Sequence, residues 1–313
     1  MPNPSPIELN LFKFSHLALR LSYPEDRLKE IHQQRKFKIH SFPIETIKSS
    51  GEIKKREIDA PLGEYKFLLK RINNRILNKL KLLDGICGAI IGKDLFDMVD
   101  IHCGREAILK IDLEDFYPNI SSRNINSTLI RNKCSPDIAR YLTELMTHNN
   151  ILPQGFSTSP MISNLVAHNL DLEQLHICEQ FDIGRTRWLD DIIFSGRRKD
   201  LELAAPKLLT AVKINGFRIN KNKTRFSGRK EKLEVVGLIT DKHKPYISQE
   251  VVEKVLMFIQ IAVAEGYEKL KVSFPEEFPK KDVRSSILGK VRHIQRFNKN
   301  QIDELENQLK KLP

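Results

Sequence analysis

Cysteine is scarce and scattered in this sequence. The 313 residues include four cysteines, at positions 87, 103, 134 and 178, and no two of them form a C-x-x-C pair. Isolated thiols at such spacing are typical of reduced, buried side chains, and they argue against a disulfide scaffold or a structural zinc site. We therefore expect four free cysteines in a protein of a reducing compartment.

Long hydrophobic runs are also absent. No apolar stretch approaches the roughly 20 residues that a helix needs to span a bilayer. The N-terminal sequence MPNPSPIELN lacks the basic-then-apolar layout of a secretion signal. These absences predict a cytoplasmic protein without membrane contact.

Acidic residues are outnumbered by basic ones. The chain has 40 Asp and Glu against 52 Lys and Arg, a net charge of +12. Such an excess predicts a polyanionic partner, most often nucleic acid, although a merely soluble basic protein is the alternative. At this length the chain can bury a large core.

The hydrophobic pattern predicts a mixture of helices and strands. Helical pieces broken at Pro24 come first, and a basic stretch over 48–81 suggests a hairpin around Gly51 and an amphipathic helix after Pro61. A solvated basic helix is the alternative for that last segment. The other expected elements are a strand over 108–112, a helix capped by Ser135 with Pro136 at its first position, a hairpin over 184–196, a helix over 199–214, a strand over 233–240, and helices after Ser248.

Two adjacent carboxylates interrupt the apolar run RWLDDIIFS at 187–195. Burying Asp190 and Asp191 side by side is costly unless cations or donors compensate, and a surface turn is the ordinary explanation of such a pair. Asp112, however, ends an expected strand upstream. If the two strands are neighbours, three carboxylates meet at one edge of a sheet, which suits two Mg²⁺ ions in phosphoryl transfer.

Five segments, in order, resemble the palm motifs of bacterial reverse transcriptases. They are KIDLEDFYPNI, LPQGFSTSPMISN, WLDDIIFSG, GFRINKNKT and VVGL, and the upstream GEIKKREIDAP with its basic helix looks like the family's fingers. Five motifs in order weigh against the surface-turn explanation. The resemblance implies an α+β right-hand polymerase with an antiparallel palm sheet. Its implied domains are N-terminal helices and fingers at 1–105, a palm at 106–245 with a helical fingers insertion at about 121–150, and a helical C-terminal thumb at 246–313.

The resemblance also implies a catalytic centre. Asp112, Asp190 and Asp191 match the catalytic metal-binding triad, and the backbone of Leu113 matches a further metal ligand. The implied cofactor is Mg²⁺, as two ions, with Mn²⁺ as an alternative. Tyr117 matches the aromatic residue that stacks under the incoming sugar and excludes a 2′-hydroxyl; without the family it would be taken for an ordinary buried aromatic.

Further substrate-binding residues follow from the same motifs. Gln154 and Gly155 match the loop against the templating pair and nucleotide, where glycine permits close backbone approach. Lys223 matches the palm lysine that reaches the departing pyrophosphate, although alone it would be a solvated lysine. The matches to the fingers cations that grip the triphosphate are Arg56 and either Lys54 or Lys55.

Within the family, PQGFSTSPMISN is similar to the retron and group II intron branch. Group II intron enzymes usually carry a maturase region after the thumb, for which this sequence has no room, so we expect the retron type. Three motifs are altered: Asn-Ala-x-x-His is MVDIH at 98–102 and retains only His102, Val-Thr-Gly is VVG at 235–237, and Tyr-Ala-Asp-Asp is WLDD at 188–191. Another defence-associated reverse transcriptase therefore stays an alternative.

The resemblance implies an RNA-directed DNA polymerase that copies a dedicated structured noncoding RNA in phage defence. The implied partners are that RNA template-primer, its RNA–DNA product (msDNA), an effector toxin from the same locus, and a host ribonuclease, since no ribonuclease segment is recognisable. Two alternatives stay open. One is RNA polymerisation, against which Tyr117 argues. The other is an RNA-binding scaffold or antitoxin with dispensable catalysis, whose signature would be degraded carboxylates.

Overall fold

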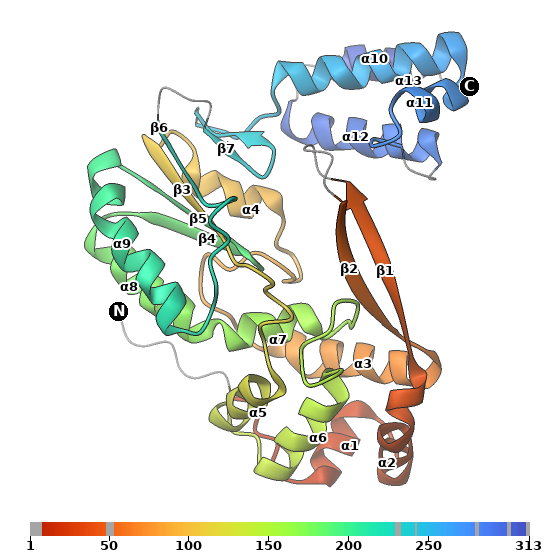
Figure 1. The fold of residues 1–313 in the computed structure, drawn as a ribbon, viewed down its shortest axis with the longest axis vertical. Coiled ribbons are helices and arrows are strands. Elements are labelled where there is room, and N and C mark those ends of the chain that lie inside the picture. Colours follow the sequence, from red (N-terminus) through yellow and green to blue (C-terminus); the bar gives the residue numbers. More distant parts are fainter. Residues whose placement is uncertain are drawn as a thin grey trace. The chain divides into compact units, whose positions relative to one another are not determined.

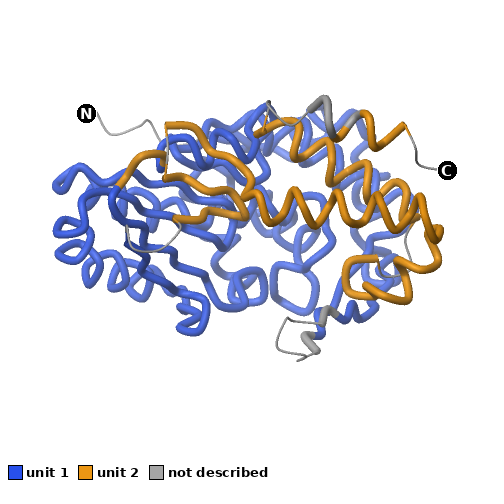
Figure 2. The backbone as a smooth tube through the Cα atoms, turned by 90° about the horizontal axis from the view of Figure 1, so that it is seen from above, with its two compact units in different colours: residues 1–102, 106–228 blue, residues 103–105, 229–313 orange. Residues whose placement is uncertain are grey.

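The chain folds into two compact units. The computed structural model describes residues 8–47, 53–228, 233–241, 243–278, 282–298 and 302–310. One unit combines residues 1–102 and 106–228, and the other combines 103–105 and 229–313 (Figure 2). The three-part division expected from the sequence stays a prediction.

Helices and a hairpin open unit 1. The elements are α1 (Phe14–Leu21), α2 (Glu25–Gln34), η1 (Arg35–Lys38), β1 (Ile39–Ile47), β2 (Ile53–Pro61), α3 (Gly63–Arg75) and η2 (Leu77–Lys79). The predicted break is confirmed, because Pro24 caps α2. β1 and β2 pair antiparallel; their connection at Gly51 lies outside the described residues. The apolar stripe of α3 is only partly buried, since Leu68 and Ile72 are in the core while Phe67 is 61% exposed.

A four-stranded antiparallel sheet forms the centre of unit 1. Its order is β4–β5–β3–β6, from β3 (Ala107–Asp112), β4 (Gly184–Trp188), β5 (Asp191–Gly196) and β6 (Arg225–Gly228). Helices α8 (His168–Gln180) and α9 (Arg198–Ile214) pack against this sheet (Figure 1). The strand at 108–112, the hairpin at 184–196 and the helix at 199–214 are thereby confirmed to within a few residues.

Short elements link the sheet to the rest of unit 1. α4 (Leu95–Val99) and η3 (Asp100–His102) pack against β4. His102 is fully buried, and its ring nitrogens lie 2.7 Å from the hydroxyls of Ser195 and Thr186. His102, the one residue of the MVDIH segment that matches the motif implied by the resemblance, therefore connects η3 to both strands of the β4–β5 hairpin.

Three further helices complete unit 1. They are α5 (Ser122–Arg131), α6 (Pro136–Met146) and α7 (Ser159–Val166). The α6 helix starts with Ser135 as N-cap and Pro136 as its first residue, as predicted. The buried apolar side chains of these helices join those of α1, α3, α8, α9 and the sheet in one continuous core.

Unit 2 is mainly helical. It contains β7 (Glu234–Val235), β8 (Leu238–Ile239), α10 (Gln249–Glu265), α11 (Tyr267–Ser273), α12 (Val283–Phe297) and α13 (Ile302–Leu309). The single strand expected over 233–240 is wrong. Val236 and Gly237 have φ values of 47° and 84°, so the chain turns there and forms a small hairpin.

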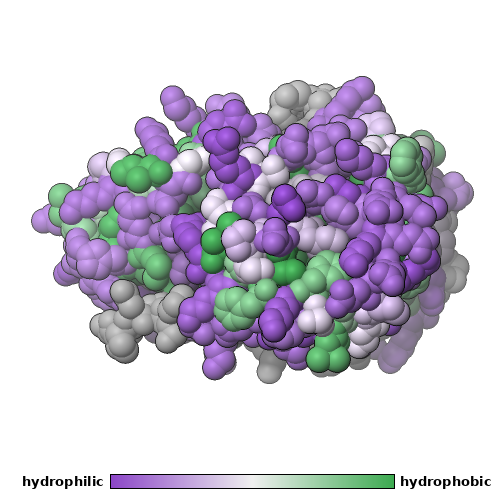
Figure 3. Space-filling model, turned by 90° about the horizontal axis from the view of Figure 1, so that it is seen from below, coloured by the Kyte–Doolittle hydropathy of each residue, from purple (hydrophilic) through white to green (hydrophobic). Residues whose placement is uncertain are grey.

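The surface agrees with the composition. Figure 3 shows a mainly hydrophilic face with hydrophobic side chains in small groups. Across the described residues no helix has the length and apolar character to cross a membrane. The four cysteines form no disulfide with one another, as expected, and three of them are buried.

Candidate active site

The three predicted carboxylates lie at one edge of the four-stranded sheet. Asp112 and Asp191 are opposite each other in the β3–β5 register, which in an antiparallel pair places their Cα atoms about 4.5–5.5 Å apart. Asp190 lies in the turn between β4 and β5, because Trp188 pairs with Asp191. The amide of Leu113 donates to the Asp190 carbonyl over 3.0 Å and ties this turn to the end of β3.

Two lysines offset the negative charge of two of these carboxylates. Lys223 Nζ lies 2.9 Å from Oδ2 of Asp112, which is only 4% exposed. Lys110 Nζ lies 3.0 Å from Oδ1 of Asp191. Lys110 is a site residue that the sequence reasoning missed. Its signal was a single lysine inside the otherwise apolar strand AILKID.

Asp190 has the least favourable surroundings of the three carboxylates. Burial raises its pKa, and the charges of Asp191 and Asp112 raise it further, while Lys223 acts in the opposite direction. A carboxylate in this position is stabilised by any cation that approaches it.

The carboxylate edge has an oxygen atom that is available to a cation. Oδ1 of Asp191 is fully buried and accepts no hydrogen bond of regular geometry from any described residue, even though the Lys110 ammonium is close. Within the described ranges, no three His, Cys, Asp or Glu side chains converge as a ready-made metal site. The donor set consists of hard carboxylate oxygens, which Mg²⁺ prefers. It therefore fits a divalent cation that would displace the lysine ammonium groups.

Tyr117 lies beside the triad. Burial raises the pKa of its hydroxyl to about 12, and the charge of Asp190 contributes in the same direction. Its ring also packs against the core, with its centroid 5.7 Å from that of Phe116. The side chain is thus a neutral, partly buried aromatic near the carboxylate in the turn.

Gln154 and Gly155 contact the β1–β2 hairpin. The amide of Asp59 donates to the carbonyl of Gln154 over 2.7 Å. Gly155 has φ +116°, and a Cβ atom on it would lie 2.4 Å from the Asp59 carbonyl oxygen. A close backbone approach at Gly155 is therefore present, and here its partner is β2. A contact with nucleotide stays a prediction.

The predicted fingers cations lie on β2. Lys55 and Arg56 are exposed, and Lys55 pairs with Glu45 over 2.9 Å. Lys54 belongs to the same strand, but its side chain lies outside the described part of the structure. Figure 1 shows this hairpin apart from the sheet that carries the triad.

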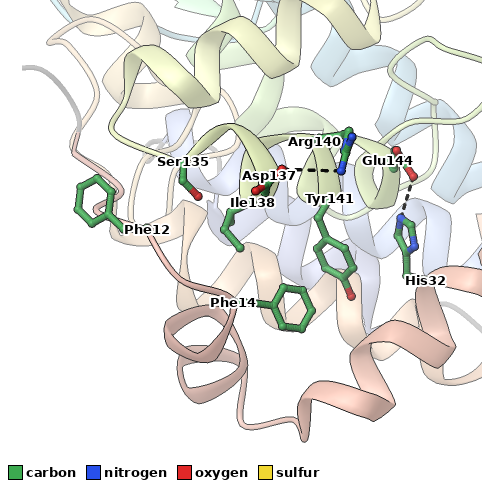
Figure 4. A pocket seen from close by; sticks show the side chains of 9 residues that line it. All are labelled: Phe12, Phe14, His32, Ser135, Asp137, Ile138, Arg140, Tyr141 and Glu144. Atoms are coloured by element: carbon green, nitrogen blue, oxygen red, sulfur yellow. Dashed lines mark ion pairs between the residues drawn. The ribbon is translucent and has the colours of Figure 1, made fainter.

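A cavity of about 460 Å³ lies elsewhere in unit 1 (Figure 4). Its lining residues are Phe12, Phe14, His32, Ser135, Asp137, Ile138, Arg140, Tyr141 and Glu144. The ring of His32 stacks on Tyr141, with centroids 4.7 Å apart. None of the predicted site residues lines this cavity.

Comparisons with known proteins show which family this chain resembles over most of its length. The family profile described as reverse transcriptase (RNA-dependent DNA polymerase) matches residues 53–240. The retron Se72 reverse transcriptase of Salmonella heidelberg (strain 579083-10) is 28% identical over 89% of this chain and 75% of its own length. The retron Ec86 reverse transcriptase of Escherichia coli is 29% identical over 67% of this chain and 66% of its own length.

A solved structure is also similar. Telomerase from Candida albicans, in complex with a TWJ fragment of telomeric RNA, matches 92% of this chain and 66% of that chain, with a TM-score of 0.45 and 11% identity. The family profile covers more than half of the present chain, and the curated relatives are named retron reverse transcriptases. The chain therefore belongs to the reverse transcriptase family of RNA-directed DNA polymerases, as a divergent relative of the retron enzymes.

Proposed function

We propose that this protein copies a structured noncoding RNA into DNA by two-metal nucleotidyl transfer at Asp112, Asp190 and Asp191. The observation that carries this proposal is the strand register, which sets Asp112 opposite Asp191 with Asp190 in the adjoining turn. Bound Mg²⁺, or Mn²⁺, would supply the positive charge that polarises the attacking and leaving oxygens. The backbone of Leu113, next to Asp112, would be a further ligand.

The lysine beside the triad has a proposed second role. Lys223 now holds Asp112 through a single ion pair with a half-exposed ammonium. A metal cation bound at Asp112 would take the place of this ammonium group and leave Lys223 available for the departing pyrophosphate. Arg56 and either Lys54 or Lys55 on β2 would bind the triphosphate through charge-assisted hydrogen bonds.

Selection of the nucleotide would depend on the surroundings of the sugar and the base. The Tyr117 ring would fill the space that a 2′-hydroxyl needs. Gln154 and Gly155 would present backbone to the templating pair, and their contact with Asp59 supports a link between that loop and the β1–β2 hairpin.

The division into fingers, palm and thumb is part of the proposal. Unit 2 would contribute the thumb, because α12 buries Ile287, Val291 and Ile294 on one face. Arg284, Arg292 and Arg296 are exposed on its other side. An exposed row of arginines favours contacts with the phosphates of a template–product duplex.

The proposed partners are those that the resemblance to retron enzymes implies. We propose the noncoding RNA template-primer and its RNA–DNA product as bound nucleic acids, and an effector protein and a host ribonuclease as further partners in phage defence. A scaffold with dispensable catalysis is less well supported, because all three carboxylates are present at one sheet edge.

The test is to express the protein with its neighbouring noncoding locus and sequence the nucleic acid that copurifies. We expect DNA joined to RNA through a 2′-linked guanosine, which collapses to a shorter species after debranching. Asp190→Asn should abolish this DNA while RNA binding stays nearly intact. The matched control is Asp115→Asn, because Asp115 is an exposed aspartate with a single weak ion pair to Arg218. Finding only unlinked RNA with intact carboxylates would favour another reverse transcriptase class.

A further inference from the structure

The turn that carries Asp190 has a strained backbone. Leu189, between Trp188 and Asp190, has φ +55°. A bulky L-residue rarely occupies this left-handed region, and it stays there only when its surroundings hold it. The direction in which Asp190 points depends on this conformation, because the two residues form the whole turn.

A buried arginine holds the turn from inside the protein. Arg187 is fully buried, and its Nη1 donates to the Leu189 carbonyl over 3.1 Å and to Oδ1 of Asn164 over 2.9 Å. Asn164 in turn donates to the carbonyl of Gly88 over 2.9 Å. The arginine therefore links the strained residue to α7 and to the segment before α4.

Arg187 is itself fixed by a carboxylate. Its Nε and Nη2 donate to the two oxygens of Asp171 over 2.7 Å and 2.6 Å, a bidentate pair that sets the plane of the guanidinium. Arg185 also donates to Asp171 and to Gln174. Two buried guanidinium groups thus share one buried carboxylate, and among the described residues Nη1 of Arg185 meets no hydrogen-bond partner.

Backbone packing closes the other sides of the turn. A Cβ atom on Gly88 would lie 2.8 Å from the amide nitrogen of Leu189 and 3.1 Å from Cα of Trp188. The Cys87 amide donates to the Arg187 carbonyl over 2.9 Å. The segment at 85–88 therefore runs directly against the turn, and only glycine at 88 leaves room for it.

We propose that Arg187 is a positioning residue, which holds Leu189 in the left-handed conformation and so aims the Asp190 carboxylate for catalysis. It is too deeply buried to meet substrate, so its effect passes through the turn. Two guanidinium groups on one carboxylate leave an excess positive charge in the core, which costs stability. A role in holding the turn gives a reason for keeping this arrangement. This inference rests on the proposed catalytic role of Asp190.

The test compares two arginines of one cluster. Arg187→Met leaves Asp171 paired with Arg185, so no unpaired carboxylate is buried, but it removes the donor to Leu189. Arg185→Met leaves the Arg187 fork and the donor to Leu189 in place. We expect Arg187→Met to lower kcat for primer extension about 100-fold, as misplacement of a reacting group by about 1 Å does. The KM for nucleotide and the Kd for duplex should stay within a few-fold.

Two readouts separate positioning from a loss of stability. The Mg²⁺ concentration at half-maximal activity should rise in Arg187→Met and stay unchanged in Arg185→Met, at temperatures where both are folded by circular dichroism. Adding Leu189→Gly to Arg187→Met should recover more than tenfold in kcat, because glycine adopts φ +55° without support. Should Arg187→Met not fold, Arg187→Lys keeps the charge but lacks the fork that serves Asp171 and Leu189 together, and it should show the same kcat loss.

Equal kcat values for Arg187→Met and Arg185→Met, or no recovery with glycine at 189, would overturn the inference. Asp190→Asn is the reference for the proposed function. If that variant is active, the catalytic assignment of Asp190 fails. If it is inactive while Arg187→Met is as active as Arg185→Met, only the positioning role fails.

Discussion

Lys223 and Asp112 form an ion pair at the edge of the sheet, with Nζ 2.9 Å from Oδ2. A lysine predicted to serve the leaving group is therefore bound to a predicted metal ligand. Binding of a metal ion to the Asp112 carboxylate would weaken its ion pair with Lys223, so the lysine and the metal ion compete for this carboxylate.

This competition predicts that Lys223→Met strengthens the response to Mg²⁺ but slows turnover. Without the ammonium, Asp112 is free for metal, and the Mg²⁺ concentration at half-maximal activity should fall several-fold. Loss of positive charge at the leaving group should lower kcat by about tenfold or more. Steady-state kinetics across a Mg²⁺ titration measure both. Lys221→Met is the control, because Lys221 is exposed nearby in the same loop. Unchanged values in Lys223→Met would show that the ion pair plays no part in catalysis.

Tyr117→Val should admit ribonucleotides without destroying DNA synthesis. The ring acts by filling space, so its removal should relax discrimination by up to about 3 kcal/mol. Tyr117→Phe keeps the ring and should keep the discrimination. Single-nucleotide incorporation with matched dNTP and rNTP gives the ratio. Equal rejection of ribonucleotides by the valine and phenylalanine variants would assign the selection to another residue.

Gly155→Ala should disturb the loop at 154–155. Its Cβ would overlap the Asp59 carbonyl, and φ +116° is strained for alanine, so we expect a loss of about 1–3 kcal/mol in the free energy of unfolding and a raised KM for nucleotide. Gly216→Ala is the matched control, with φ +81° and open space around the position. Because Gly216→Ala carries the strain without the overlap, a raised KM in both variants would argue against a specific contact at Gly155.

Asp171→Asn should be strongly destabilising at neutral pH. Burial alone would raise the pKa of this carboxyl, but Arg187 and Arg185 hold it below its ordinary value. Removing the charge leaves two buried guanidinium groups unpaired, at a cost of about 3–5 kcal/mol in the free energy of unfolding. Urea unfolding of the wild type and the variant measures the difference.

The pH dependence of that difference has a definite sign. A depressed carboxyl pKa stabilises the fold above the pKa of the unfolded chain, and this stabilisation is lost as the pH falls through the folded value. The difference in the free energy of unfolding between the wild type and Asp171→Asn should therefore be constant near neutrality. It should become smaller only in strong acid. Asp137→Asn, at an exposed ion pair with Arg140, should change the free energy of unfolding by less than about 1 kcal/mol. If the difference in the free energy of unfolding already became smaller between pH 7 and 5, the lowered pKa of Asp171 would be contradicted.

The sequence by itself determined features that depend on near neighbours. Ser135 and Pro136 start a helix because an N-cap and a fixed φ act within one turn. The pair Asp190 and Asp191 at a hairpin was readable because short apolar runs flank it. The matching motifs identified the family for the same reason, since each is a short stretch with its own chemistry.

Only the tertiary structure decided which distant residues meet. Alternation along a strand does not specify the sheet order β4–β5–β3–β6, yet that order brings Lys110 to Asp191. Likewise, no local pattern links Arg187 to Asp171, and only the packing of α8 against β4 brings the two side chains together. Burial then determines how these charged side chains behave, because a charge in the core is strongly destabilising without a partner of opposite charge or a hydrogen bond. Folding brings such partners together from distant parts of the sequence.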